Sequence, residues 1–172
     1  MTAQIQRVVA LGLGVMGIAL ILAGCQYQPE QLAVGPGSML AIPMFGNRTF
    51  RAGLEDVLTQ EVRKQFLLGS RLEMVSVEDA DLVLQGTVAY YQKEPVSQVA
   101  DELAEYRVEL HVRASLCDRR TGRQHWNREL TDSVTYAPVT GHTLQTEEEA
   151  IERVCQHLAV ALVNLTTEGW ER

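Results

Sequence analysis

A single cysteine near the start of the chain carries the residue pattern best suited to covalent chemistry. Cys25 follows Leu22, Ala23 and Gly24, so its thiol lies beside residues small enough to enter a narrow protease cleft. The thiolate is the strongest nucleophile among ordinary side chains, and it could accept a covalent group here. An apolar run precedes it and starts just after Arg7, the one charge in this stretch. A charged start, an apolar middle and a small-residue exit are typical of a secretory signal.

The tetrapeptide that ends in this cysteine resembles the lipobox of bacterial lipoproteins. The resemblance implies that Cys25 takes a diacylglycerol, that a peptidase cuts between Gly24 and Cys25, and that the freed amine is acylated. Each buried methylene adds roughly 0.8 kcal/mol, so several chains give a stable membrane anchor. Gln26 stands where aspartate tends to mean retention at the inner membrane, which implies export to the outer membrane. The alternative is one transmembrane helix, although the run is at the short end of the roughly 17 to 25 residues that span a bilayer.

These features divide the chain into three parts. We predict a signal peptide over 1–24, a lipid-anchored tether rich in proline and glycine over 25–38, and a single domain over 39–172. The net charge of the chain is −7, and loss of Arg7 with the leader lowers it to −8. So acidic a protein gives no support for nucleic-acid binding.

Other residues with catalytic chemistry lack a supporting pattern. Ser115, His125 and Asp132 could form a hydrolytic trio, yet no glycine-framed nucleophile accompanies them. The acidic residues from 147 to 152 suit a helix N-terminus for structural reasons. No zinc-binding spacing is present, and we expect neither metal nor cofactor nor enzyme activity. Cys117 and Cys155 are expected to be free or buried thiols, with a disulfide as the alternative.

Apolar spacing gives an order of elements and a fold. Helices are predicted over about 52–68 and from the N-cap Thr146 to about 166. Strands are predicted over 39–45, 82–92, from 106 onwards and 124–136, with a brief strand or bend over 72–77, a tight turn at 118–122, and loops over 93–101 and 138–145. This β-α-β-β-β-α order predicts an α+β domain with both helices on one face of the sheet and the other face exposed.

Strand faces follow from strict alternation. From Tyr106 onwards, apolar side chains alternate with polar ones, so one face is buried and the other is wet or available to a ligand. In the strand over 82–92 the same rule places Tyr90 on one face and Tyr91 on the opposite face. The first face should hold Leu82, Leu84, Val88 and Tyr90, and the second Val83, Gln85, Thr87 and Tyr91.

Several segments, in their order along the chain, resemble the LptE family of lipopolysaccharide-assembly lipoproteins. They are the segment from Ala41 to Thr49 (AIPMFGNRT), Gly53-Leu54-Glu55 opening a helix, Ala80 to Thr87 (ADLVLQGT), Tyr106-Arg107-Val108, and Asp118 to Gly122 (DRRTG) followed by Trp126. The family fold is two helices on one face of a four-stranded, mainly antiparallel sheet. The resemblance implies a lipoprotein of the outer membrane that plugs the lumen of the LptD barrel, helps that barrel assemble and contacts lipopolysaccharide. Other lipoproteins of similar architecture, such as a peptidoglycan-synthase activator or a secretion-pore subunit, are the alternatives.

A cluster of arginines offers the positive surface that lipopolysaccharide phosphates would need. Six arginines lie between 107 and 128 against only Glu109 and Asp118, so this segment is +4 while the rest of the mature chain is −12. Guanidinium groups bind phosphate oxygens in pairs. On charge alone, the candidate contacts are Arg107, Arg113, Arg119, Arg120 and Arg123. Alternatively, these side chains are solvated charges or partners of carboxylates in a barrel wall.

Overall fold

The computed structural model describes residues 38–99, 102–140 and 143–167. The predicted leader, and the predicted tether apart from Ser38, lie outside these residues, so the three-part division of the chain stays a prediction. Within the described ranges, no helix combines the length and apolar character needed to cross a membrane.

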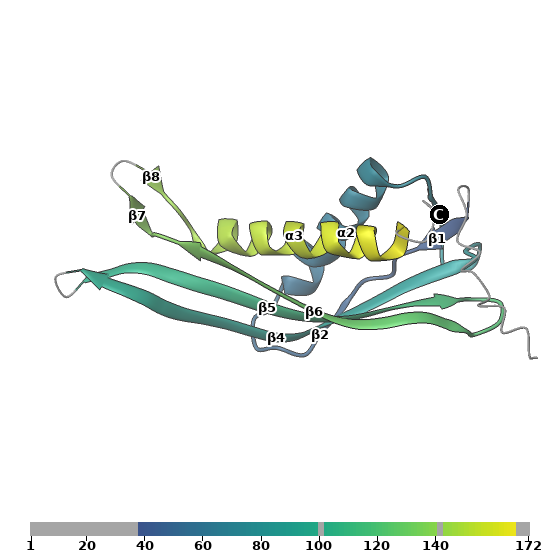
Figure 1. Cartoon of the computed structure of the whole chain (residues 1–172), viewed down its shortest axis with the longest axis horizontal. Coiled ribbons are helices and arrows are strands. Elements are labelled where there is room, and N and C mark those ends of the chain that lie inside the picture. The colour runs from purple at the N-terminus through teal and green to yellow at the C-terminus, as the bar shows by residue number, and fades with distance from the viewer. Residues whose placement is uncertain (1–37, 100–101, 141–142, 168–172) are drawn as a thin grey trace, which may run out of the picture. The chain divides into compact units, whose positions relative to one another are not determined.

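Three long strands form an antiparallel meander at the base of the domain (Figure 1). They are β4 (Leu82–Val99), β5 (Glu102–Asp118) and β6 (Gln124–Tyr136). The predicted alternation in β5 is confirmed, because the even-numbered side chains from Val108 to Leu116 are all buried. On β6, Trp126, Leu130 and Val134 pack against the same core, as predicted.

Short parallel strands extend the sheet beyond β4. The first, β1 (Met39–Ala41), lies between β4 and β3 (Glu73–Met74), and β2 (Gly46–Asn47) pairs with β4 further along. Pro43 separates β1 from β2, which divides the single strand predicted over 39–45. The Arg63 guanidinium donates to the Ile42 carbonyl at 2.6 and 3.0 Å, so this interruption leaves no unpaired acceptor at Ile42.

Two amphipathic helices cover one face of this sheet. They are α2 (Leu54–Gly69) and α3 (Glu147–Thr167), and both lie on the same side of the strands (Figure 1). Their apolar stripes join the buried face of the sheet in one core. Thr146 caps α3 as predicted: its hydroxyl accepts from the Glu149 backbone N–H, while the Glu149 carboxylate accepts from the Thr146 N–H, each at 3.1 Å. The predicted α+β fold is confirmed.

The ends of the hairpins differ from the prediction. Residues 93–99, predicted to be part of a loop, continue β4, and β5 starts at Glu102. A second, two-stranded hairpin of β7 (Val139–Thr140) and β8 (Thr143–Leu144) replaces much of the loop predicted over 138–145. Both regions contain polar residues and few apolar ones. Pairing of the backbone with the neighbouring strand holds them extended, and periodicity of apolar residues does not report such pairing.

A β-bulge in β4 reverses the predicted faces of two tyrosines. Val88 pairs with Val112 and Tyr90 with His111, so Ala89 is an extra residue without a partner opposite it. The extra residue places Tyr91 on the helix-covered face, where it packs against the core. Tyr90 is instead 41% exposed, with its ring centroid 4.7 Å from that of His111. The prediction for both tyrosines was wrong because alternation was carried through the bulge.

The tyrosine that the bulge turns inward helps fasten α3 to β4. The Tyr91 hydroxyl donates to the Glu147 carboxylate at 2.6 Å, and the Lys93 ammonium donates to the same carboxylate at 2.7 Å. These hydrogen bonds, first from Lys93 and then from Tyr91, hold the pKa of Glu147 below its ordinary value. The Lys93 ammonium also lies 4.7 Å from the centroid of the Tyr106 ring.

Replacing Glu147 with glutamine should therefore reduce stability in a pH-dependent way. A carboxyl whose pKa is lower in the folded chain stabilises the fold above its unfolded pKa, about 4.3, and this contribution is lost as the pH falls through the folded pKa. We expect Glu147→Gln to lower the free energy of unfolding by roughly 1 to 2 kcal/mol at pH 7, with the difference shrinking below pH 4. Urea titrations at both pH values measure this. Glu148→Gln, at a carboxylate 69% exposed, is the matched control and should have little effect.

Candidate functional site

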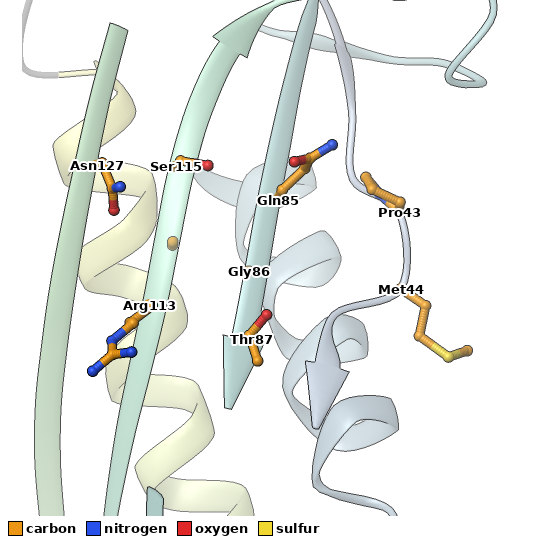
Figure 2. A pocket seen from close by; sticks show the side chains of 9 residues that line it. Pro43, Met44, Gln85, Gly86, Thr87, Arg113, Ser115 and Asn127 are labelled. Atoms are coloured by element: carbon orange, nitrogen blue, oxygen red, sulfur yellow. The ribbon is translucent and has the colours of Figure 1, made fainter. Parts of the chain in front are cut away.

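The face of the sheet opposite the helices is polar apart from a small buried cluster of Ala41, Ala80 and Val83 at its β1 end, and no second layer of the described chain covers it. Side chains from three strands form rows across it, because strand register brings them opposite one another. Figure 2 shows this face toward the reader, with the helices behind the strands. The rows are Gln85, Ser115 and Asn127; Thr87, Arg113 and Glu129; and Tyr90, His111 and Thr131.

A hollow of about 440 Å³ opens on this face beside the break between β1 and β2. Pro43 and Met44 form one side of it, and Arg113 projects from β5 near the other (Figure 2). Hydroxyl and amide groups line the remainder: Gln85, Thr87, Ser115 and Asn127. Such groups both donate and accept hydrogen bonds, which suits a polar ligand or a polar protein surface.

The two predicted arginines on this face are already paired with carboxylates. Arg113 Nε lies 2.8 Å from Glu129 Oε2, and Arg107 Nη1 lies 3.3 Å from Glu94 Oε1. The hydrogen bond from Arg113 lowers the pKa of Glu129, which keeps that carboxylate charged beside the guanidinium. An anionic ligand would have to displace or share these contacts, and exposed pairs of this kind are weak enough to be displaced.

The other three predicted arginines lie on the turn between β5 and β6. Asp118 Oδ1 accepts from the Thr121 backbone N–H at 2.7 Å, and Gly122 takes a φ of 71°, as predicted for this turn. Arg119, Arg120 and Arg123 are exposed there. The predicted cluster is thus two groups: one pair on the sheet face and one triplet on the turn. We define the second group as the arginine turn.

The arginine turn lies at the end of the sheet where the described chain begins. The Arg119 backbone N–H donates to the Asp81 carbonyl at 2.8 Å, and the Asp81 N–H donates to the Met39 carbonyl at 2.9 Å. Arg120 and His125 share a small hollow of about 240 Å³ with Ser38. The turn therefore neighbours the first described residues, which follow the predicted tether.

The residues considered for catalysis do not come together. Ser115 lies opposite Asn127 on the uncovered face. Asp132 lies opposite the buried Leu110, and its Oδ2 is 2.8 Å from His157 Nδ1 on the helix-covered side. The described part of the chain holds no cluster of three or more groups able to bind a metal. Cys117 and Cys155 are both free, and burial raises the pKa of the Cys155 thiol to about 12. The expectation of free thiols is confirmed.

The charge-pairing carboxylates were not among the predicted site residues. Glu94 and Glu129 oppose Arg107 and Arg113 only because of strand register, and Glu94 lies in the segment predicted to be a loop. The hollow depends on the break at Pro43, where sequence signalled an interruption but not which side chains would line it. An alternation pattern gives the face of a residue; it does not give its neighbour on the next strand.

Comparison with known proteins places these features in context. The family model described as LptE, lipopolysaccharide-assembly, matches residues 38–165. No curated protein matches the chain. Among solved structures, a Xanthomonas campestris protein has a TM-score of 0.58 at 14% identity, covering 83% of this chain and 90% of its own. A Chlamydia trachomatis hypothetical protein has a TM-score of 0.54 at 11% identity, covering 77% and 99%. A minor lipoprotein from Acinetobacter baumannii has a TM-score of 0.51 at 20% identity, covering 76% and 94%. These structures share the fold.

Proposed function

Because the chain belongs to the LptE lipopolysaccharide-assembly family, we propose that it acts as the plug of an LptD-type outer-membrane barrel. Membership itself implies a role in lipopolysaccharide assembly and a partner in that assembly, and the family is not enzymatic. In the proposed role the domain occupies the barrel lumen, helps the barrel to assemble and takes part in delivering lipopolysaccharide to the cell surface. The match to residues 38–165, nearly the whole described domain, is the observation that carries this proposal.

The one-sided architecture supports a role inside a larger protein. Both helices lie on one face of the sheet, and the opposite face presents rows of hydroxyl, amide and paired charged groups. A polar face of this kind is compatible with water and also with a polar lumen, which is the character of barrel interiors. The proposal therefore requires no change of fold on insertion.

The proposed location follows from the lipobox and the family together. Membership in the LptE family supports an outer-membrane lipoprotein. We propose that acyl chains on Cys25 hold the protein on the periplasmic side of that membrane, and that residues 26–38 connect the anchor to the domain. The start of the described chain lies beside the arginine turn, so the turn would be at the anchored end of the domain.

The arginine turn is the part of the predicted cluster best placed to bind lipopolysaccharide phosphates. Replacing both Arg119 and Arg120 with glutamate should weaken lipopolysaccharide binding by roughly tenfold or more, since a hydrogen bond to a charged group contributes about 1.5 to 3 kcal/mol. The variant should unfold at the wild-type temperature, because both side chains are exposed. Binding to the purified lipoprotein and a thermal melt measure the two effects.

The paired arginines of the sheet face provide the comparison for that experiment. Arg107→Glu with Arg113→Glu should change binding less, because Glu94 and Glu129 already neutralise these guanidinium groups. A larger effect at the sheet face than at the turn would move the contact to the hollow. No effect in either variant would mean that none of these four arginines binds lipopolysaccharide.

Copurification tests the plug proposal directly. The tagged, full-length lipoprotein is extracted from outer membranes in mild detergent, and its principal companion is identified by mass. We expect an LptD-type barrel in stable association. Recovery of a peptidoglycan synthase instead would favour the activator alternative, and recovery of only further copies of this chain would favour the secretion-pore alternative.

A further inference from the structure

The segment between β2 and α2 presents a fully exposed aromatic side chain. Phe50 has a relative exposure of 109%, so its ring makes no appreciable contact with the rest of the domain. The other large exposed apolar side chains in the described ranges retain more contact, with exposures from 36% to 76%. Leaving a ring of this size entirely in water forgoes the stabilisation that burial gives.

The backbone around Phe50 is held by a dense set of hydrogen bonds. Asn47 organises it: its side-chain amide donates to the Arg51 carbonyl at 2.7 Å and to the Glu55 carboxylate at 2.6 Å. The Asn47 side-chain oxygen accepts from the Thr49 N–H at 2.9 Å and from the Thr49 hydroxyl at 2.8 Å. These hydrogen bonds fix the backbone on both sides of Phe50. Because the segment is already ordered, a partner that binds the ring would lose little further conformational entropy.

The segment is also fastened to the rest of the domain at both ends. The Arg48 N–H donates to the Val88 carbonyl at 2.9 Å, which extends the β2–β4 ladder by one bond. The Arg51 guanidinium lies 2.9 Å from Glu148 on α3. Phe50 therefore lies in a segment that is hydrogen-bonded to β4 and to α2 and ion-paired with α3.

The edge of β4 next to this segment is also unpaired over much of its length within the described residues. Beyond the Val88 to Arg48 bond, β4 continues from Tyr90 to Val99 with β5 on one side and no strand of the described residues on the other. An open edge of this length is normally covered or protected. The exposed ring and the open edge adjoin one another, because Arg48 forms the last bond before the open part of the edge begins.

We propose that Phe50 is an anchor by which the domain docks on its protein partner. The partner presents an apolar pocket for the ring, with a carboxylate at the rim to meet the exposed Arg48. Single aromatic side chains in desolvated pockets, often with arginine beside them, carry much of the affinity of protein interfaces. The inference rests on the proposed function in one respect, namely that the partner is the barrel.

A membrane surface is the less favoured occupant. The segment offers one aromatic ring beside the charged Arg48 and Arg51, which is a small apolar area for insertion into lipid. Register also separates it from the anchored end, because Leu40 pairs with Leu82 whereas Asn47 pairs with Val88. Six strand residues correspond to roughly 20 Å.

Photocrosslinking in the intact outer membrane tests the proposal. The photoreactive aromatic p-benzoylphenylalanine replaces Phe50 in the full-length lipoprotein coexpressed with the barrel, and Leu67, 69% exposed on α2, carries it in a matched control. We expect an adduct with the barrel at position 50. We also expect Phe50→Ala to lower recovery of the complex at least tenfold under stringent washing, with Leu67→Ala unchanged and both variants melting as wild type.

The other possible results separate failure of the Phe50 anchor from failure of the proposed plug function. An adduct with lipid alone, or unchanged recovery of Phe50→Ala together with no adduct, would overturn the proposal while leaving the plug function standing. If the wild-type protein does not copurify with a barrel, the proposed function fails. The crosslinked product at position 50 then tests the anchor independently of that function. One defined protein, crosslinked at position 50 and bound more weakly by purified Phe50→Ala, would support the anchor; no protein adduct would overturn it.

Discussion

Serine in place of Cys25 should prevent acylation and leave the precursor uncleaved, so that no mature lipoprotein reaches the outer membrane. The proposed acyl chains contribute roughly 0.8 kcal/mol for each buried methylene, so their loss removes the whole anchoring energy. Serine keeps the size of the side chain but not the thiolate, which is the nucleophile. Fractionation of cells and the intact mass of the protein measure the effect, and we expect nearly complete loss from the mature membrane-bound pool.

Cys117→Ser is the matched control for that experiment. Cys117 is a free, half-buried thiol on β5, and its replacement should leave acylation, cleavage and location unchanged. A Cys25→Ser protein that still carried acyl chains would contradict the lipobox assignment. Membrane-bound wild-type protein that carried no acyl groups and still kept residues 1–24 would instead favour a transmembrane helix over 8–23.

Alanine in place of Gly86 should be the most destabilising small substitution in the sheet. A Cβ added there would stand 2.2 Å from Cε2 of Phe45 and 2.5 Å from its Cδ2, far inside van der Waals contact. The ring cannot easily retreat, because Phe45 is only 2% exposed and its N–H donates to the Thr59 hydroxyl at 3.0 Å. We expect the free energy of unfolding to fall by about 3 kcal/mol, which is the upper end of the range for overpacked cores. Urea unfolding measures this change.

Two further variants show whether the Phe45 ring is the cause. Gly69→Ala introduces a Cβ at an ordinary 3.6 Å from Val163 Cγ1, at the end of α2, and should not destabilise the domain. In a Phe45→Leu background, Gly86→Ala should cost less than in the wild type, because the smaller side chain leaves room for the methyl group. If Gly86→Ala lowered the free energy of unfolding equally in both backgrounds, the backbone of β4, and not the Phe45 ring, would be the cause of the destabilisation.

Strong local patterns in the sequence predicted much of this domain. The apolar alternation of β5, the cap at Thr146 and the glycine of the 118–122 turn each depend on interactions within one element or between adjacent elements. Both helices were placed on one side of the sheet because one apolar face needs one cover. These inferences needed no knowledge of which strands are neighbours.

The features that sequence did not reveal depend on pairing between distant segments. The bulge at Ala89 exchanges the faces of Tyr90 and Tyr91, and it becomes visible only once Val88 and Val112 are known to be opposite. Likewise, charge counting grouped five arginines as one candidate surface. Strand register separates Arg107 and Arg113, each beside a carboxylate, from the three arginines of the turn. The exposure of Phe50 also went unpredicted, because its neighbours in the sequence suggest only a turn.

The arrangement of β1 has a mechanical consequence if the proposed lipid anchor holds the domain by its N-terminal end. β1 lies between β3 and β4, parallel to both, and its ladder partners are Glu73 and Met74 on one side and Leu82 and Val83 on the other. Tension arriving through the chain before Ser38 pulls along this strand, so it loads the flanking hydrogen bonds in shear and they must rupture together. A domain tethered in this way resists being stretched off its anchor far better than one attached through a strand that could peel away bond by bond.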